Sequence, residues 1–233
     1  VVTDIWYYIS KKSNSISFTT KMITLSFFGV LLIATAITFF GESTIQHYPV
    51  FERLEIAAFQ TVNAISTAGY NSIPLSNLTL GVLLTIIFLM YVGAAPSSTG
   101  GGMKITTLTA VIAIVKSKVR NQAKVTYLGK KIPADRLEMA VSTFIFYTAI
   151  LFFSVFLLSF TENQSLEKLL FEATSAIGTV GLSMGITGSL SVWGKIILIS
   201  IMFIGRVGVI TFGLAILAKK QHKKIDNETD LAV

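Results

Sequence analysis

One motif occurs twice in this chain, once in each half of the sequence. The first copy reads FQTVNAISTAGYN from Phe59 to Asn71, and the second reads FEATSAIGTVGLS from Phe171 to Ser183. The copies align without a gap, and Phe, Ala, Ile, Thr and Gly recur at the same positions. Each copy lies between two long apolar segments. A polar Thr-x-Gly loop that is repeated between such segments is typical of an ion-selective pore.

The chain is too apolar for a soluble domain of its length. Of its 233 residues, 52% are hydrophobic and 13% are charged, and the mean hydropathy is +0.71. A soluble domain of this size cannot bury so much apolar surface, so part of the chain must be solvated by lipid. There is no cysteine, which excludes disulfides and thiolate metal sites.

Four segments are predicted to cross the membrane, because a bilayer core of about 30 Å needs about 20 helical residues. They are Met22–Phe40, Thr79–Ala95 with a continuation to Val115, Leu137–Phe160 and Val192–Ala218. Two further segments have helical periodicity but are too short and too polar to cross. They are Phe51–Ile65 and Gln164–Ile177.

The basic residues are distributed unevenly between the two sides of the membrane. If the N-terminus is cytoplasmic, 15 of the 19 Lys and Arg residues lie inside and three lie outside, while Arg206 falls within a span. This pattern follows the positive-inside rule, so we expect a multi-pass protein of the cell membrane with both termini in the cytoplasm. The same topology accounts for the net charge of +7, and nucleic acid is not expected as a partner.

The two short segments are predicted to be helices that enter the membrane from outside and end within it. Acidic residues lie near their starts, Glu52 and Glu55 in the first and Glu162 and Glu167 in the second, and carboxylates are favoured at a helix N-terminus. The polar loop after each helix must then return to the outside. Irregular backbone is tolerated at that depth only where it is buried in protein or lines water.

The two returning loops are predicted to form an ion filter, in which backbone carbonyls replace the hydration shell of a cation. The predicted filter residues are Thr67, Ala68, Gly69, Tyr70, Thr179, Val180, Gly181 and Leu182. The simpler interpretation is that both glycines only allow a turn or close packing. The repetition in register, after a short helix and before a span, favours the filter.

The second span is predicted to be broken at a glycine-rich motif. As one helix, Thr79–Val115 would be about 55 Å long, which exceeds the bilayer core. The motif that runs from Pro96 to Gly102 removes a backbone donor and adds flexibility, so the helix should open there. This region is either a mobile loop that blocks or clears the ion path, or a passive kink at the membrane boundary. The predicted gate residues are Pro96, Gly100, Gly101, Gly102 and Arg206.

Arg206 is a charged residue in the middle of the predicted span Val192–Ala218. Placing arginine near the bilayer centre costs at least about 2.5–3.5 kcal/mol, so the side chain should face the interior of the protein or a water-filled cavity. Backbone carbonyls of the glycine-rich loop are its expected partners, because its own span contains no acid. One hypothesis is that Arg206 holds this loop closed and sets an electrostatic barrier below the filter. The alternative is a structural bond between helices.

Four motifs together resemble the Trk/Ktr/HKT potassium-uptake family, and within it the bacterial Ktr-type membrane subunits. The motifs are TAGYN from Thr67, GAAPSSTGGGMK from Gly93, GTVGLSMGIT from Gly178 and MFIGRVG from Met202. The resemblance implies that four units of span, pore helix, loop and span surround one pore, with the glycine-rich motif as an intramembrane gate. This chain has two units, which resemble the third and the fourth.

We therefore expect an all-α membrane protein with two tandem M1-P-M2 repeats, each made of a span, a pore helix with its loop, and a second span. The expected order is a linker at residues 1–21, a first repeat at 22–115 with a broken second span, a basic cytoplasmic connection at 116–136, a second repeat at 137–218 and a cytoplasmic tail at 219–233.

The expected function is potassium-selective permeation into the cell, without catalysis and without an organic cofactor. Potassium is the expected ion at the filter, moving passively or with the assistance of sodium. One alternative is a coupled sodium/potassium symporter, although inverted repeats would be more typical of a transporter. The other is a non-conducting fragment or assembly subunit that needs two further repeats, because two loops supply half of a filter and the chain starts with Val rather than Met.

Three kinds of partner are expected. Membrane lipid surrounds the spans, and a homodimer would bring four loops round one axis. The resemblance to Ktr-type proteins implies a cytoplasmic nucleotide-binding regulatory subunit. The basic connection at 116–136 is either its docking site or a solvated, lipid-facing inner loop.

Overall fold

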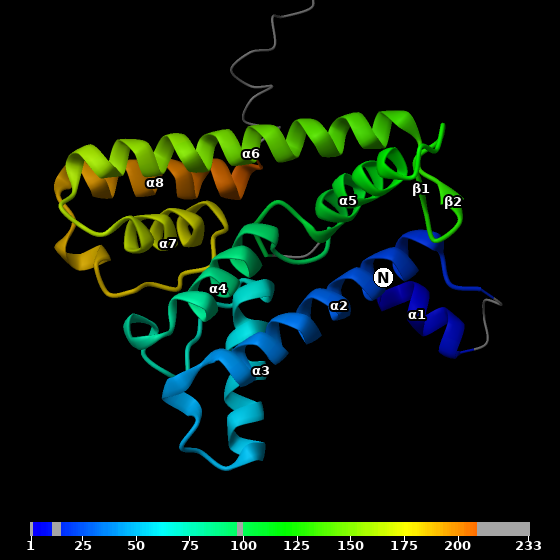
Figure 1. The fold of residues 1–233 in the computed structure, drawn as a ribbon. Coiled ribbons are helices and arrows are strands. Elements are labelled where there is room, and N and C mark those ends of the chain that lie inside the picture. Colours follow the sequence, from blue (N-terminus) through cyan, green and yellow to red (C-terminus); the bar gives the residue numbers. More distant parts are fainter. Residues whose placement is uncertain (1, 11–14, 97–99, 209–233) are drawn as a thin grey trace, which may run out of the picture.

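The computed structural model describes residues 2–10, 15–96 and 100–208, and these residues are mostly helical (Figure 1). The helices are α1 (Val2–Ile9), α2 (Phe18–Gly41), α3 (Val50–Ser66), α4 (Leu80–Val92), α5 (Ile105–Val119), α6 (Ala134–Thr161), α7 (Leu166–Ile177) and α8 (Val192–Val207). Three single-turn 3-10 helices lie in the loops at Ser43–Ile45, Leu75–Asn77 and Thr187–Ser189.

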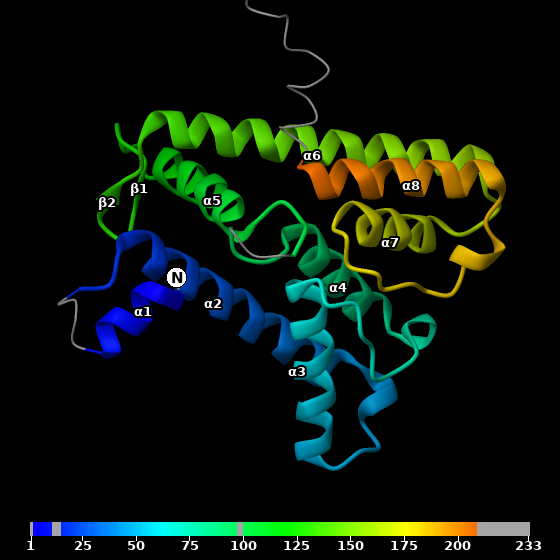
Figure 2. The same ribbon diagram turned by 180° about the vertical axis from the view of Figure 1, so that it is seen from behind.

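Within the described residues, two helices are long and apolar enough to cross a membrane by themselves, and these are α2 and α6. The predicted spans Met22–Phe40 and Leu137–Phe160 lie inside them. The region predicted as a broken span, Thr79–Val115, contains the two separate helices α4 and α5, which a non-helical connection joins (Figures 1 and 2). The chain between them, from Gly93 to Lys104, is the position at which we expected the break.

Helix α8 is shorter than the predicted span Val192–Ala218. It ends at Val207, because Gly208 has φ of 95° and its N–H caps the carbonyl of Ile204. Residues 209–218 of the predicted span lie outside the described part of the chain, as does the tail at 219–233. Arg206 therefore lies in the last turn of α8. This differs from the prediction, which placed it in the middle of a longer helix.

A small antiparallel hairpin makes the fold depart from the all-α prediction. Strands β1 (Thr126–Tyr127) and β2 (Lys130–Lys131) pair in the connection between α5 and α6. Its two turn residues, Leu128 and Gly129, both have positive φ, at 48° and 75°. Such a turn matches the twist of two paired strands. The sequence did not predict this turn, because leucine is not a residue typical of its first position.

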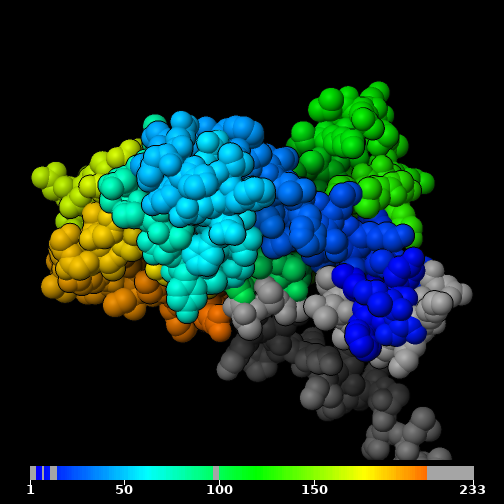
Figure 3. All heavy atoms as spheres, turned by 90° about the horizontal axis from the view of Figure 1, so that it is seen from below, coloured from blue at the N-terminus to red at the C-terminus, as the bar shows by residue number. Residues whose placement is uncertain are grey.

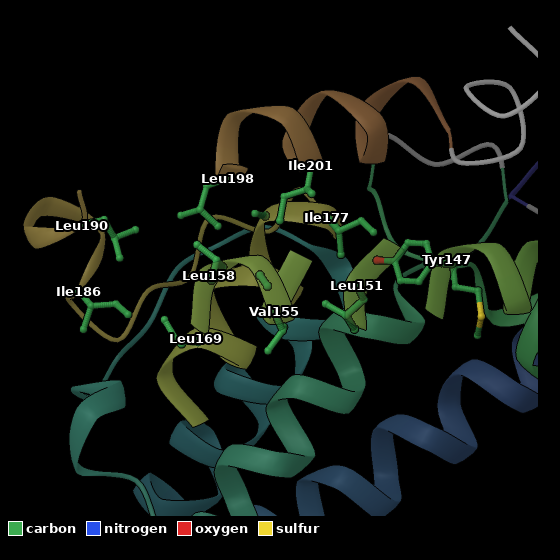
Figure 4. Close-up of a cluster of buried hydrophobic side chains, with 13 residues drawn as sticks. Tyr147, Leu151, Val155, Leu158, Leu169, Ile177, Ile186, Leu190, Leu198 and Ile201 are labelled. Carbon is green, nitrogen blue, oxygen red and sulfur yellow. The ribbon is translucent and has the colours of Figure 1, made fainter. Parts of the chain in front are cut away.

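Two large apolar clusters hold most of the helices together, and a small third one of Ile23, Val92 and Ile105 joins α2, α4 and α5. The first joins α6, α7 and α8 around Leu158, Ile177 and Leu198, with Leu190 from the loop that precedes α8 (Figure 4). The second joins α2, α3 and α4, and it also contains Phe171 of α7. Because α7 belongs to both clusters and packs against α4, the two halves of the chain contact each other. In Figure 3 the cyan and teal atoms of the first half lie directly beside the gold and orange atoms of the second.

A carboxylate ties each long helix to the start of a later helix in the same half. Glu42 follows α2 and accepts hydrogen bonds from the amide and the hydroxyl of Thr79, the N-cap of α4, at 2.9 and 3.1 Å. Glu162 follows α6 and accepts in the same way from Ser191, the N-cap of α8. We had placed Glu162 near the start of α7, and that prediction was wrong, because α7 begins at Leu166.

Candidate functional site

Helices α3 and α7 end in the same backbone conformation. Thr67 and Thr179 follow them with φ of 58° and 51°, and the glycines two residues later have φ of 80° and 92°. The amide of Ala68 donates to the carbonyl of Asn63 at 3.1 Å, and Val180 repeats this bond to Ser175 at 2.9 Å. A threonine in the left-handed region is strained, and glycine tolerates positive φ. The repeated motif therefore encodes a repeated backbone geometry.

The two loops after α3 and α7 lie against each other. A Cβ atom built on Gly69 would collide with the carbonyl oxygen of Val180 and would lie 3.6 Å from the Cα of Gly181. The loops are not identical in their surroundings, since Tyr70 is 70% exposed whereas Leu182 is buried. The structure thus brings the two predicted filter segments together and excludes any side chain at position 69.

A buried polar side chain in each short helix holds the backbone that leaves its loop. Gln60 of α3 accepts a hydrogen bond from the amide of Ser72 at 3.1 Å. Glu172 occupies the position of α7 that is equivalent to Gln60 in the repeat, and it accepts from the amide of Met184 at 3.0 Å. Met184 is in turn the equivalent of Ser72, and the side chains of Gln60 and Glu172 are both buried. Buried polar groups need such partners, so these bonds fix the position of the chain where it leaves each loop.

Glu172 binds two further donors that Gln60 lacks. The hydroxyl groups of Ser183 and Thr187 donate to its carboxylate at 2.6 and 2.8 Å. Hydrogen bonds to a charged acceptor are stronger than neutral ones. Sequence reasoning missed both Gln60 and Glu172. The sequence signal for Glu172 was an acidic residue at the second position of the repeated motif, in a part of α7 whose other residues are buried.

The glycine-rich segment between α4 and α5 lies beside the ends of both short helices. A Cβ on Gly100 would lie 2.6 Å from the hydroxyl oxygen of Thr67, and one on Gly101 would collide with the carbonyl oxygen of Gly178. The base of the segment is closed by backbone bonds from Met103 to Tyr91 at 3.1 Å and from Lys104 to Val92 at 2.8 Å. Of the predicted gate motif, residues 97–99 lie outside the described part of the chain.

Lys104 is a site residue that sequence reasoning did not identify. Its side-chain nitrogen donates to the carbonyl oxygen of Gly100 and lies 3.4 Å from that of Gly101. Its backbone has φ of 82° and ψ of 136°, a conformation that residues with a side chain rarely adopt. We had counted Lys104 only as an inner positive charge. Its position at the end of the glycine-rich motif was the available signal.

Arg206 lies close enough to Lys104 for the two positive charges to repel each other. The adjacent Gly205 packs directly against the carbonyl of Ile177 at the end of α7. Arg206 also lines a cavity of about 520 Å³ together with Glu172, Thr179 and Gly181. The structure therefore brings the predicted gate arginine to the loop that follows α7.

The chemistry of this site is that of backbone carbonyls, hydroxyls, the Glu172 carboxylate and two cations. Within residues 2–10, 15–96 and 100–208, no group of three or more His, Asp or Glu side chains could hold a metal ion. Carbonyl and hydroxyl oxygens are ligands that a bare monovalent cation accepts in place of water.

A protein family and several known proteins match this chain. Residues 5–227 match the TrkH family, described as a cation transport protein. The chain is 32% identical over 195 residues to the Ktr system potassium uptake protein B of Bacillus subtilis (strain 168), covering 84% of this chain and 43% of that protein. It is 34% identical over 227 residues to the Ktr system potassium uptake protein D of the same organism, covering 95% and 50%.

A solved structure has a similar fold. The potassium transporter TrkH from Vibrio parahaemolyticus matches with a TM-score of 0.69 and 21% sequence identity, over 84% of this chain and 43% of that one. The chain spans about half the length of the curated relatives it matches.

Proposed function

Since this chain belongs to the TrkH family of cation transport proteins, we propose that it forms part of a potassium-selective pathway into the cell. Relatives that share about a third of its residues are potassium uptake proteins. One further relative, at 35% identity, is a potassium/sodium uptake protein of Enterococcus hirae, which keeps sodium-assisted transport within the proposal.

The contact between Gly69 and the Val180 carbonyl is the observation that carries this proposal. Two segments far apart in sequence have the same threonine and glycine conformations and meet at their backbones. In the proposed filter, carbonyl oxygens of residues 67–70 and 179–182 line a common axis and replace water around potassium. Helices α3 and α7 direct their C-terminal ends, which carry partial negative charge, towards these segments.

The proposed arrangement in the membrane follows from the same elements. In the first M1-P-M2 unit, α2 is the first span, α3 the pore helix, and α4 with α5 the broken second span. In the other unit these parts are α6, α7 and α8. The positive-inside rule places the α5–α6 connection in the cytoplasm. Two further filter segments would come from the remainder of a longer protein or from a second copy in a homodimer.

The proposed gate is the segment from Gly93 to Lys104, with Arg206 beside it. Gly100 and Gly101 lie against the ends of α3 and α7, on the path that an ion leaving the filter would take. The side chain of Lys104 donates a hydrogen bond to Gly100 within the segment, and Arg206 adds a second positive charge. A cytoplasmic nucleotide-binding subunit that acts on this gate is part of the proposal and rests on the resemblance to Ktr systems.

Potassium uptake by a bacterial strain without its own uptake systems tests the proposal. We expect the protein to restore growth at low potassium, and Gly181→Ser to reduce the preference for potassium over sodium. Gly181 suits this test because a Cβ there would meet no other atom within 4 Å, so the substitution alters backbone conformation without a clash. An unchanged ion preference in a well-expressed Gly181→Ser variant would overturn the filter assignment.

A further inference from the structure

A second pocket, of about 360 Å³, lies away from the candidate pore, at the end of α5. Its walls are the last turn of α5, the β1–β2 hairpin and the side chain of Leu25 from α2. These elements lie at the same end of the molecule, opposite α7 (Figures 1 and 2). The mechanism proposed above uses none of these residues.

Two cations face this pocket without an ion pair. Lys116 lies in the last turn of α5 and Arg120 is its C-cap, four residues later, and both line the pocket. Among the residues that the structure describes, neither side chain has a carboxylate partner, and both are exposed. The end of α5 carries only about half a negative charge, which two full positive charges exceed. The pocket is therefore suited to an anion.

The surrounding segment has the same excess of positive charge. Residues 116–136 contain seven Lys or Arg residues and a single acid, Asp135. Under the positive-inside topology this segment is at the cytoplasmic membrane surface, where anionic lipids attract basic residues.

The walls of the pocket are fixed by hydrogen bonds between separate elements. The hydroxyl of Tyr127 in the hairpin bonds to that of Ser26 in α2 at 3.0 Å. The amide of Thr126 donates to the hydroxyl of Ser117 in α5 at 3.3 Å. Because these bonds join the hairpin to both α2 and α5, the pocket keeps its shape without a ligand.

The pocket is amphipathic, which distinguishes a lipid from a free anion. Leu25 and Leu128 line it and are 56% and 52% exposed, although both are apolar. Val115 and Val119 precede the two cations on α5 and are also exposed. Apolar side chains beside cations are typical of a site at the boundary between acyl chains and headgroups.

From this juxtaposition we propose that the pocket binds the phosphate headgroup of an anionic glycerophospholipid in the cytoplasmic leaflet. Lys116 and Arg120 contact the phosphate, and the arginine can offer two parallel N–H groups to its oxygens. Leu25 and Leu128 contact the first carbons of the acyl chains. The lipid thereby joins α2, α5 and the hairpin at one point of the membrane surface.

Native mass spectrometry of the protein released from nanodiscs tests this site. Nanodiscs that contain phosphatidylglycerol and phosphatidylcholine supply the probe, and the retained phosphatidylglycerol is counted. We expect the Lys116→Gln/Arg120→Gln variant to bind phosphatidylglycerol roughly thirtyfold more weakly than the unchanged protein, at about fivefold for each lost surface cation. The matched control is Lys118→Gln/Lys131→Gln, which removes the same charge from the same segment outside the pocket lining, and it should retain the lipid.

Three results would overturn the proposal. Equal lipid loss in both double variants would show attraction by net charge alone. Displacement of the lipid by millimolar inorganic phosphate would show a free-anion site. Unchanged lipid retention, with loss of a soluble protein partner, would show a docking surface. Lys116→Arg should keep the lipid bound, which separates loss of charge from misfolding.

Discussion

The backbone of Gly69 lies in contact with the carbonyl group of Val180, although the two residues belong to different copies of the repeated motif. No methyl group fits between the two. By contrast, a Cβ at Gly181 would point into open space. The two equivalent glycines of the repeated motif therefore differ in whether the surrounding structure has room for a side chain.

The first prediction compares these two glycines. Gly69→Ala adds both positive-φ strain and a backbone clash, so we expect the free energy of unfolding to fall by about 2–6 kcal/mol. Gly181→Ala adds only the strain and should cost about 1–3 kcal/mol. Thermal unfolding of the purified variants in detergent measures the difference. Equal destabilisation would show that the two loops do not meet as described.

The second prediction concerns the buried carboxylate of Glu172. Glu172→Gln keeps the shape but replaces charged hydrogen bonds with neutral ones, and it should lower the free energy of unfolding by about 1–3 kcal/mol. Potassium preference should fall with it, because Ser183 and Met184 lose a strong acceptor. Uptake of potassium against sodium gives the second measurement. Glu167→Gln, an exposed acid in the first turn of the same helix, is the control; it should lower the free energy of unfolding by less than about 1 kcal/mol and leave potassium preference unchanged.

The third prediction separates two roles of Lys104. Lys104→Ala removes the bond to Gly100 but keeps a side chain at φ of 82°, whereas Lys104→Gly removes the bond and also relieves the backbone strain. Both variants should raise potassium uptake if the bond holds the gate closed. The glycine variant should be the more stable one by about 1–2 kcal/mol. Lys118→Ala, an exposed lysine on α5, is the control, and unchanged uptake in both Lys104 variants would exclude the gating role.

The fourth prediction concerns the charge of Arg206. Arg206→Ala should raise potassium uptake, because it removes one of two cations beside the proposed ion path. Arg206→Lys retains the charge and should leave uptake low. Lys195→Ala tests for a general effect of charge on the same helix, since this lysine is exposed at the other end of α8. Lower stability with unchanged uptake in Arg206→Ala would identify a purely structural residue.

The fifth prediction is a dependence of stability on pH through Glu162. The hydrogen bond from the Ser191 hydroxyl, more than any other contact, holds the pKa of Glu162 below its ordinary value of 4.5. The stabilisation is therefore fully present above the pKa of the unfolded chain and is lost as the pH falls through the lower folded pKa. Unfolding temperatures measured between neutral and acidic pH should fall less steeply below pH 4.5 in Glu162→Gln. Parallel curves for both proteins would show that this carboxylate gives no pH-dependent stabilisation.

Much of the helical framework could be predicted from the sequence, because hydrophobic periodicity is local. Helices α3 and α7 lie where the pattern predicts them, and the break after α4 lies at the predicted glycine-rich motif. The prediction of TrkH-type family membership is confirmed. The filter and gate assignments stay predictions.

Some of what the sequence did not reveal depends on contacts between distant residues. Glu162 reaches Ser191 across 29 positions, and this bond is set by how separate helices pack. The bond from Lys104 to Gly100 spans only four positions, but no pattern of residue types predicts a side chain that turns back onto its own loop. The β1–β2 hairpin was missed for the opposite reason, because its strands have two residues each and are too short for any periodicity.

The close contacts around Gly100 and Gly101 give the glycine-rich segment a role other than flexibility. A Cβ on Gly100 would lie too close to Thr67 at the end of α3, and one on Gly101 would collide with Gly178 after α7. Neighbouring glycines of one segment thus contact the two halves of the chain separately, and their small size allows both halves to approach the segment closely. A larger residue at either position would displace one half from it, so the width of the proposed pathway would depend on these two positions.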